Sequence, residues 1–153
     1  IIITRPVVES GESLGFLPGE LEDKYDPYLA PVKEILSDCL GRGFVNYLIK
    51  TGKVQFKPLA YMRGTTFKNC WVLLDEAQNT TPKQMEMFLT RIGDNSQVIV
   101  NGDIRQSDIG GVSGLSDAIN RLANCNDVRV CHFEADDVVR SGLVRRIIQA
   151  YST

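Results

Sequence analysis

The chain has 153 residues, of which 43% are hydrophobic and 24% are charged, and its formal net charge is −2. This length suits one domain over residues 1–153, and the composition is that of a globular protein rather than a disordered one. No apolar run approaches the roughly 20 residues that cross a bilayer, which argues against a membrane protein. The near-neutral charge argues against binding nucleic acid through bulk charge, although a local basic stripe stays open.

Residues that bind metals or act as nucleophiles are scarce. A single histidine, His132, argues against His-rich metal sites and against a Ser-His-Asp or Cys-His centre. The four cysteines form no CxxC pair, and each lies in or beside an apolar segment: Cys39, Cys70, Cys125 and Cys131. We therefore expect reduced, buried thiols in a cytoplasmic protein.

The first half of the chain alternates strands with amphipathic helices. Residues 1–4 are a β-branched run, typical of a buried strand, and a Gly- and Pro-rich loop follows. Asp26-Pro27 predicts the start of a helix, with Pro at its first position. We then expect a short helix over 44–49 and a strand over 54–57.

The second half has clearer elements. A continuous apolar run over 70–74 predicts a strand buried on both faces of a parallel sheet. Thr81 and Gln84 form a capping box that begins the next helix. The remaining expected elements are a strand over 97–101, a helix over 115–122 capped by Ser113, a strand over 128–133 and a helix over 143–151. Strands separated by helices predict an α/β domain with a largely parallel sheet.

Acidic residues follow two of the expected strands, where parallel sheets bind their ligands. Asp75-Glu76 follows one strand and Asp103 closely follows the next. In a chemical interpretation, Asp75 holds a magnesium ion and Glu76 orients and deprotonates the water that attacks a terminal phosphate. In a structural interpretation, both acids cap the following turn and helix. The acidic pair alone leaves both interpretations open.

The neighbouring residues resemble those of known ATPases. Asp75-Glu76-Ala77-Gln78-Asn79 resembles the Walker B element of helicase-like P-loop ATPases, and Gly102-Asp103-Ile104-Arg105-Gln106 resembles the third motif of superfamily-one helicases. Over nearly the whole chain, the order of short motifs is similar to that of the PhoH-like ATPases: Thr4-Arg5-Pro6, Gly15-Phe16-Leu17-Pro18-Gly19, Tyr61-Met62-Arg63-Gly64, Gln84-Met85, Leu89-Thr90-Arg91, Ser113-Gly114-Leu115, Asp137-Val138-Val139-Arg140 and Ala150-Tyr151.

This resemblance implies a RecA/helicase-like P-loop NTPase fold and an ATPase that uses ATP and Mg²⁺. Asp75 would then be the metal ligand, Glu76 the general base, and Gln106 a contact to the terminal phosphate. Asn101 resembles a polar sensor residue that aligns the attacking water, and its alternative is a turn former. Gln78 and Asp103 complete the set of residues expected near the nucleotide.

The resemblance further implies a ring-like homo-oligomer coupled to RNA or single-stranded nucleic acid. Arg140 is the expected arginine finger reaching a neighbouring subunit, and its alternative is a salt bridge that holds the start of the last helix. Arg5 and Arg63 are expected to contact nucleic-acid phosphates, and Tyr61 is expected to stack on a base. In the alternative, the two arginines form salt bridges within the protein and the tyrosine packs against it.

Two departures from the family pattern limit these expectations. No lysine lies in a GxxxxGK[ST] frame, so the P-loop and its strand are expected upstream of this chain, which begins within a strand and without Met. The chain alone should therefore turn over little ATP. Residues 63–66 read Arg-Gly-Thr-Thr, where the family usually has Arg-Gly-Arg-Thr, which removes one cation from a loop expected to face phosphate or nucleic acid.

We therefore expect the C-terminal portion of a PhoH-like ATPase that holds Walker B, sensor and arginine-finger elements. The alternative is a non-hydrolysing interaction or RNA-binding module that has lost the P-loop. The coding sequence upstream of Ile1 separates the two, since a strand followed by GxxxxGK[ST] supports the enzyme. A dinucleotide-binding protein is set aside, because no GxGxxG follows a strand.

Overall fold

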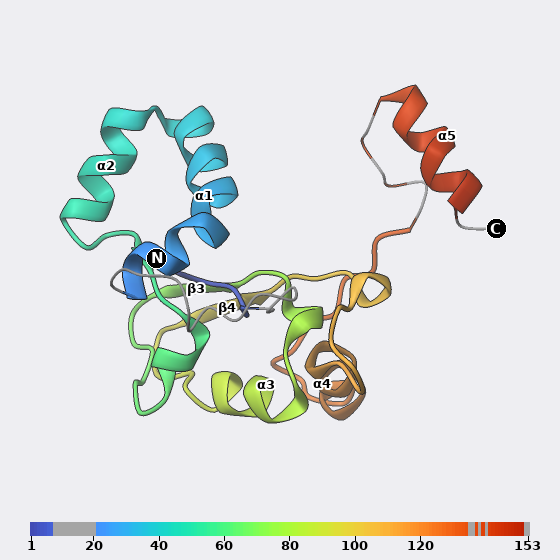
Figure 1. Ribbon diagram of the computed structural model, residues 1–153. Helices are drawn as coiled ribbons and strands as arrows, with labels where there is room; N and C mark the ends of the chain where they lie inside the picture. Colours follow the sequence, from blue (N-terminus) through green and yellow to red (C-terminus); the bar gives the residue numbers. More distant parts are fainter. Residues whose placement is uncertain (8–20, 135–136, 138, 140, 152–153) are drawn as a thin grey trace. The chain divides into compact units, whose positions relative to one another are not determined.

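The computed structural model describes residues 1–7, 21–134, 137, 139 and 141–151 (Figure 1). Internal packing divides the chain into two compact units, Ile1–Arg121 and Leu122–Thr153. The first unit holds the sheet and most of the helices. The single domain expected over the whole chain stays a prediction.

The first unit is built on a four-stranded sheet. Its strands are β1 (Ile2–Thr4), β2 (Gln55–Phe56), β3 (Trp71–Leu74) and β4 (Gln97–Val100). They lie in the order β2-β1-β3-β4, and every pair is parallel. With helices flanking this sheet, the prediction of an α/β fold with a largely parallel sheet is confirmed.

The register aligns the ends of three neighbouring strands. Thr4 pairs with Leu74, and Leu74 pairs with Val100. The backbone N–H of Asp75 donates to the Thr4 carbonyl at 3.0 Å, and that of Asn101 donates to the Leu74 carbonyl at 2.8 Å. The residues that directly follow the three strands therefore emerge side by side at the carboxyl edge of the sheet.

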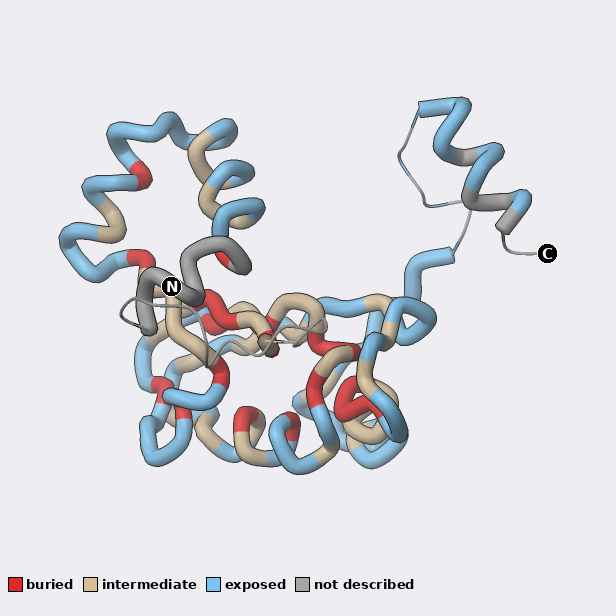
Figure 2. Tube along the Cα trace, viewed as in Figure 1, coloured by how far each residue is buried: buried red, intermediate tan, exposed pale blue. Residues whose placement is uncertain are grey.

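The hydrophobic core lies between the sheet and the helices α3 (Pro82–Leu89) and α4 (Gly114–Leu122). Leu74 of β3 is fully buried with Phe88 of α3, and the Phe88 ring lies 5.7 Å from that of Phe67. Figure 2 shows buried residues on the sheet and on the helices below it. The predicted capping box of α3 is present, with Thr81 and Gln84 bonded reciprocally, so the helix starts where the sequence indicates.

Two further helices, α1 (Leu21–Leu40) and α2 (Arg42–Lys50), pack against each other. Gly41 joins them with a φ of 83°, a left-handed conformation that glycine adopts without steric cost. The predicted start of α1 at Pro27 is wrong by about two turns, because Leu21, Glu22 and Lys24 are good helix formers and the acids Glu22 and Asp23 suit the first turn. The Lys33 ammonium of α1 lies 5.3 Å from the centre of the Phe56 ring, which links α1 to β2.

In the second unit, the helix α5 (Gly142–Tyr151) confirms the predicted terminal helix. The strand predicted over 128–133 is wrong, since these residues form no ladder and Phe133 is 84% exposed. Apolar, β-branched residues favour a strand only where a neighbouring strand satisfies their backbone groups. None of the strands described in the first unit pairs with this segment.

The cysteines and the helices bear on two general predictions. All four cysteines are free, as expected, but Cys39, Cys125 and Cys131 are exposed and only Cys70 is partly buried. The prediction that the thiols are buried is therefore wrong for three of them, which lie on the outer side of α1 or in the second unit. Within the described ranges, no helix combines the length and apolarity that crossing a membrane requires.

The free edge of β4 should cause the purified 153-residue chain to associate. Among the described strands, β4 is paired only with β3, so its other edge presents unpaired backbone groups. Lysine on an edge strand discourages such pairing, so Ile99→Lys on β4 should reduce the apparent mass measured by light scattering. Ile35→Lys on α1 is the control, because Ile35 is 63% exposed and Ile99 is 50% exposed. A monodisperse wild-type monomer that melts cooperatively would contradict this prediction.

Candidate functional site

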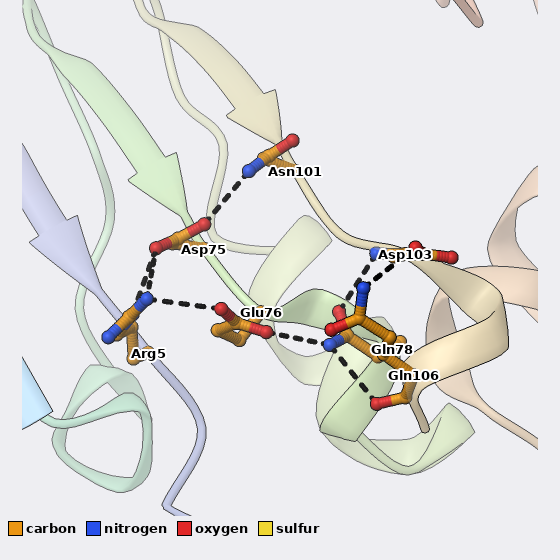
Figure 3. A network of polar contacts seen from close by, with 7 residues as sticks. All are labelled: Arg5, Asp75, Glu76, Gln78, Asn101, Asp103 and Gln106. Carbon is orange, nitrogen blue, oxygen red and sulfur yellow. Dashed lines mark hydrogen bonds and ion pairs between the residues drawn. The ribbon is translucent and has the colours of Figure 1, made fainter. Parts of the chain in front are cut away.

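Two carboxylates at the end of β3 converge on a single guanidinium (Figure 3). The Nε and Nη2 atoms of Arg5 each lie 2.8 Å from Oδ2 of Asp75, and Nη2 lies 3.1 Å from Oε1 of Glu76. The side chains of Arg5 and Asp75 are 17% and 14% exposed, whereas that of Glu76 is 45% exposed. Partly buried carboxylates need such a compensating charge, and the register of β1 against β3 supplies it.

The other oxygen of Asp75 is held from β4. Nδ2 of Asn101 donates to Oδ1 of Asp75 at 2.9 Å. Asp75 therefore accepts bonds from both neighbouring strand ends, one from a charged donor and one from an amide. This pair of contacts fixes the orientation of the carboxylate before any ligand binds.

Gln78 links Glu76 to the segment that follows β4. Its Nε2 donates to Oε2 of Glu76 at 2.7 Å and to the Gln106 carbonyl at 3.4 Å, and its Oε1 accepts from the Asp103 backbone N–H at 3.2 Å. The Gln78 residue is only 1% exposed. Both ends of the amide are thus bonded within the protein, and the side chain positions Glu76 against the turn at 103–106.

Several contacts around Gln78 were not anticipated from the sequence. Oγ of Ser107 donates to the Gln78 carbonyl at 3.1 Å, and the Asp108 N–H donates to Oδ1 of Asn79 at 2.8 Å. A Cβ added to Gly102 would lie 2.5 Å from Oε1 of Gln78, so only glycine lets the turn approach the buried amide. The polar Gln78-Asn79 pair beside the acids was the one signal for this contact in the sequence.

The turn after β4 begins the 3₁₀ helix η4 (Ile104–Gln106) and is capped by Asp103. The Arg105 backbone N–H donates to Oδ1 of Asp103 at 2.9 Å, and Nε2 of Gln106 donates to Oδ2 at 3.0 Å. The backbone bond from Arg105, with smaller contributions from the Arg105 and Gln106 side chains, holds the pKa of Asp103 below its ordinary value. The bonds of this turn therefore favour the ionised form of Asp103.

Glu76 has a backbone conformation that is uncommon for a residue with a side chain. Its φ and ψ of 54° and 37° are left-handed, and it precedes the 3₁₀ helix η3 (Ala77–Asn79). The Ala77 N–H donates to the Asn101 carbonyl at 2.9 Å, and the Asn79 N–H donates to the Glu76 carbonyl at 3.0 Å. These bonds hold the sharp turn between β3 and η3.

The structure brings most of the predicted site residues into one network and leaves others outside it. The network joins seven residues from three strand ends and their turns: Arg5, Asp75, Glu76, Gln78, Asn101, Asp103 and Gln106. Tyr61 lies in the 3₁₀ helix η2 (Leu59–Met62) and is 53% exposed, and Arg63 follows it and is also exposed. Among the described residues, neither side chain forms a hydrogen bond or an ion pair with the network. Arg140 lies outside the described residues.

The donor set of this network suits a hard cation. Mg²⁺ in proteins is commonly bound by one or two carboxylates together with waters and substrate phosphates. Oδ2 of Asp75 and Oε1 of Glu76 already face one positive group, the Arg5 guanidinium. The described residues contain no group of three His, Cys, Asp or Glu side chains able to hold a metal, so a cation bound here would take its remaining ligands from water or a substrate.

A cavity of about 490 Å³ lies at the opposite ends of the same strands. Its lining comes from the residues at the starts of β3 and β4: Asn69, Cys70, Trp71, Asn95, Ser96 and Gln97. The acids follow the last residues of the strands, so the cavity and the carboxylates are separated by the length of β3. The cavity is therefore not part of the carboxylate site.

Comparisons with known proteins agree with the resemblance seen in the sequence. A family profile described as PhoH-like protein matches residues 1–152. The chain is 51% identical over 156 residues to Protein PhoH of Escherichia coli K12 and 50% identical over 153 residues to a PhoH-like protein of Bacillus subtilis. Each alignment covers 99% of this chain, but only 44% and 48% of those proteins. The chain thus spans less than half the length of these curated relatives.

Gly102→Ala should destabilise the chain by about 1–3 kcal/mol, the usual cost of overpacking. The added methyl group would lie 2.5 Å from Oε1 of Gln78 and 2.9 Å from Cδ2 of Leu115, which must shift. Gly110→Ala is the control, because nothing lies within 4 Å of its added Cβ. Urea denaturation of the two variants measures the difference. Equal free energies of unfolding would show that the turn does not depend on close contact with Gln78.

Proposed function

Because the chain belongs to the PhoH-like protein family, a family of P-loop ATPases, we propose that the full-length protein binds ATP with Mg²⁺ and hydrolyses it at the carboxylates that follow β3. The observation that carries this proposal is the convergence of Asp75 and Glu76 at the carboxyl edge of a parallel sheet. Ligands of such sheets bind at this edge. In the structural interpretation, the acids only cap the next turn and Arg5 only compensates their charge.

Glu76 is the proposed general base. Its side chain is more exposed than that of Asp75, and Gln78 holds its Oε2 at 2.7 Å. An oriented carboxylate can align a water molecule and accept its proton as that water attacks a terminal phosphate. Gln78 acts here as a positioning residue, since it is buried and bonded at both ends of its amide.

Asp75 is the proposed ligand of Mg²⁺, and the donor set described above fits this ion. When bound, Mg²⁺ neutralises negative charge on the phosphates. Asn101 keeps Asp75 in place through its bond to Oδ1 and is also the proposed sensor beside the attacking water. Gln106 is the proposed contact to the terminal phosphate, and its exposed side chain is held by Asp103 at 3.0 Å.

Association with RNA or single-stranded nucleic acid is the second part of the proposal. The exposure of Tyr61 and Arg63 leaves a ring and a cation available to a base and a phosphate. Arg5 forms ion pairs with Asp75 and Glu76, as the salt-bridge alternative for this residue predicts. A nucleic-acid phosphate at Arg5 would therefore compete with the two carboxylates for its guanidinium. A ring-like homo-oligomer with Arg140 acting between subunits completes the proposal, and the free thiols support a cytoplasmic location.

The alternative function is a non-hydrolysing interaction or RNA-binding module. A module of this kind would lack the GxxxxGK[ST] loop, whose backbone and lysine cradle the phosphates of P-loop enzymes. The sequence of the full-length protein discriminates between the two. A strand followed by GxxxxGK[ST] before Ile1 supports the enzyme.

Glu76→Gln in the full-length protein should leave ATP binding nearly intact while lowering turnover by about two to four decades, the usual contribution of general acid–base catalysis. Asp75→Asn should instead weaken Mg²⁺-dependent ATP binding. Phosphate release and nucleotide binding are the measurements. Glu86→Gln, the same change at an exposed acid of α3, is the control. Equal, small losses from Glu76→Gln and Asp75→Asn would favour the structural interpretation.

Arg140→Ala should remove turnover that a neighbouring subunit can restore. Subunits carrying Arg140→Ala, mixed with subunits carrying Glu76→Gln, should regain turnover if the guanidinium acts across the interface, because such fingers contribute roughly three to five decades of rate. Arg146→Ala on α5 is the control, since that residue is exposed. No rescue at any mixing ratio, with a lowered melting temperature of Arg140→Ala, would support the salt-bridge alternative.

A further inference from the structure

Positive charge is concentrated in one segment of this nearly neutral chain. Residues 39–74 contain no Asp or Glu and six cations: Arg42, Lys50, Lys53, Lys57, Arg63 and Lys68. The rest of the chain holds the other 11 of the 17 Lys and Arg residues together with all 19 acids. The chain therefore has a local basic region despite its net charge of −2, and such a region is typical of proteins that bind a polyanion.

Most of these cations are on the surface. Five of them are exposed, and none of the five takes part in an ion pair among the described residues: Arg42, Lys50, Lys53, Arg63 and Lys68. The ion pairs described in the first unit use Arg5, Arg105 and Arg121. These five cations are therefore not tied up in close ion pairs with acids of the described residues.

Aromatic side chains lie among the cations on α2. Phe44 and Tyr47 are 52% and 58% exposed, and their rings are stacked with centroids 6.2 Å apart and planes 18° apart. Tyr47 is three positions after Phe44 and three before Lys50, so the three side chains are neighbours on the helix surface. Val45, between them in sequence, is buried and anchors the opposite side of the helix.

This combination suits a single strand of nucleic acid better than a protein surface. Bases stack on aromatic rings whatever their sequence, and a row of cations follows the phosphates. Protein interfaces favour Tyr but are depleted in Lys. Here Lys50 follows the two rings on the helix, Lys53 lies in the turn after it, and no acid lies between Arg42 and Lys57.

We propose that the outer side of α2 and the turn after it bind single-stranded nucleic acid, with Phe44 and Tyr47 on the bases and Arg42, Lys50 and Lys53 on the phosphates. These five residues are the α2 surface. The proposal rests on the nucleic-acid association proposed above and extends it to a surface separate from Arg5 and the carboxylates. Recognition there is independent of base sequence, because stacking and charge carry it.

Binding of the full-length protein to labelled oligouridine and oligodeoxyuridine of about 12 nucleotides, followed by fluorescence anisotropy across a range of salt concentrations, tests the α2 surface. The double variant Phe44→Ala/Tyr47→Ala should lose at least about tenfold in affinity. Lys50→Ala should weaken binding and reduce the slope of log affinity against log salt by about 0.7. Equal effects with both oligomers indicate a surface for any single strand, and a loss confined to one identifies which strand it binds.

Two variants outside the α2 surface are the controls. Phe133→Ala removes another exposed aromatic ring, and Lys83→Ala removes an exposed cation of α3. Both should bind as the wild type does, and melting temperatures establish that every variant is folded.

Affinities that stay within about twofold of wild type in both α2 variants would overturn the proposal. Loss of self-association with nucleic-acid binding retained would also overturn it, in favour of a protein partner. A wild-type protein that binds nucleic acid through Tyr47 but hydrolyses no ATP would support the α2 surface while contradicting the proposed hydrolysis. A wild-type protein that hydrolyses ATP but binds neither oligomer would contradict the α2 surface while supporting the proposed hydrolysis.

Discussion

The in-register parallel pairing of β1, β3 and β4 is the constraint on which the candidate site depends. Because Thr4, Leu74 and Val100 end their strands in one row, the next residues emerge as neighbours. A cation, a carboxylate and an amide thereby meet without any long loop to position them. A slip of one residue in either pairing would move these side chains apart and turn each to the other face of the sheet. The register of the sheet therefore determines which side chains meet at the candidate site.

A second constraint couples the two turns beyond the sheet. Gln78 is buried between the turn after β3 and the turn after β4, and its amide bonds to groups of both. Gly102 permits this approach because it has no Cβ. A shift in the segment at 103–106 would therefore move the partner that holds Glu76. In the proposed ATPase, this coupling links the residue expected at the terminal phosphate, Gln106, to the expected base.

What the sequence predicted correctly depends on local patterns. The apolar run over 70–74 and the capping box of Thr81 and Gln84 require only neighbours in the chain, and both the strand and the box are present. The prediction that this strand is buried on both faces is wrong, because Trp71 is 52% exposed and only Val72 and Leu74 are buried. The bonds of Gln78 to the 103–106 turn join residues 25 and 28 positions apart, so they follow from register and could not be read from any local pattern. The strand over 128–133 failed for the related reason that pairing needs a neighbour that composition does not reveal.

Glu76 combines a strained backbone with a carboxylate that two donors hold. A non-glycine residue in the left-handed region costs on the order of 1–3 kcal/mol and persists only where its surroundings determine it. Here the strand end fixes the backbone through the bond from Ala77 to Asn101, while Arg5 and Gln78 hold the two carboxylate oxygens. Glycine would relieve the backbone cost, but it would leave both donors without this acceptor. The fold thus bears a local cost at a residue whose carboxylate is both oriented and accessible, the combination that the proposed general base requires.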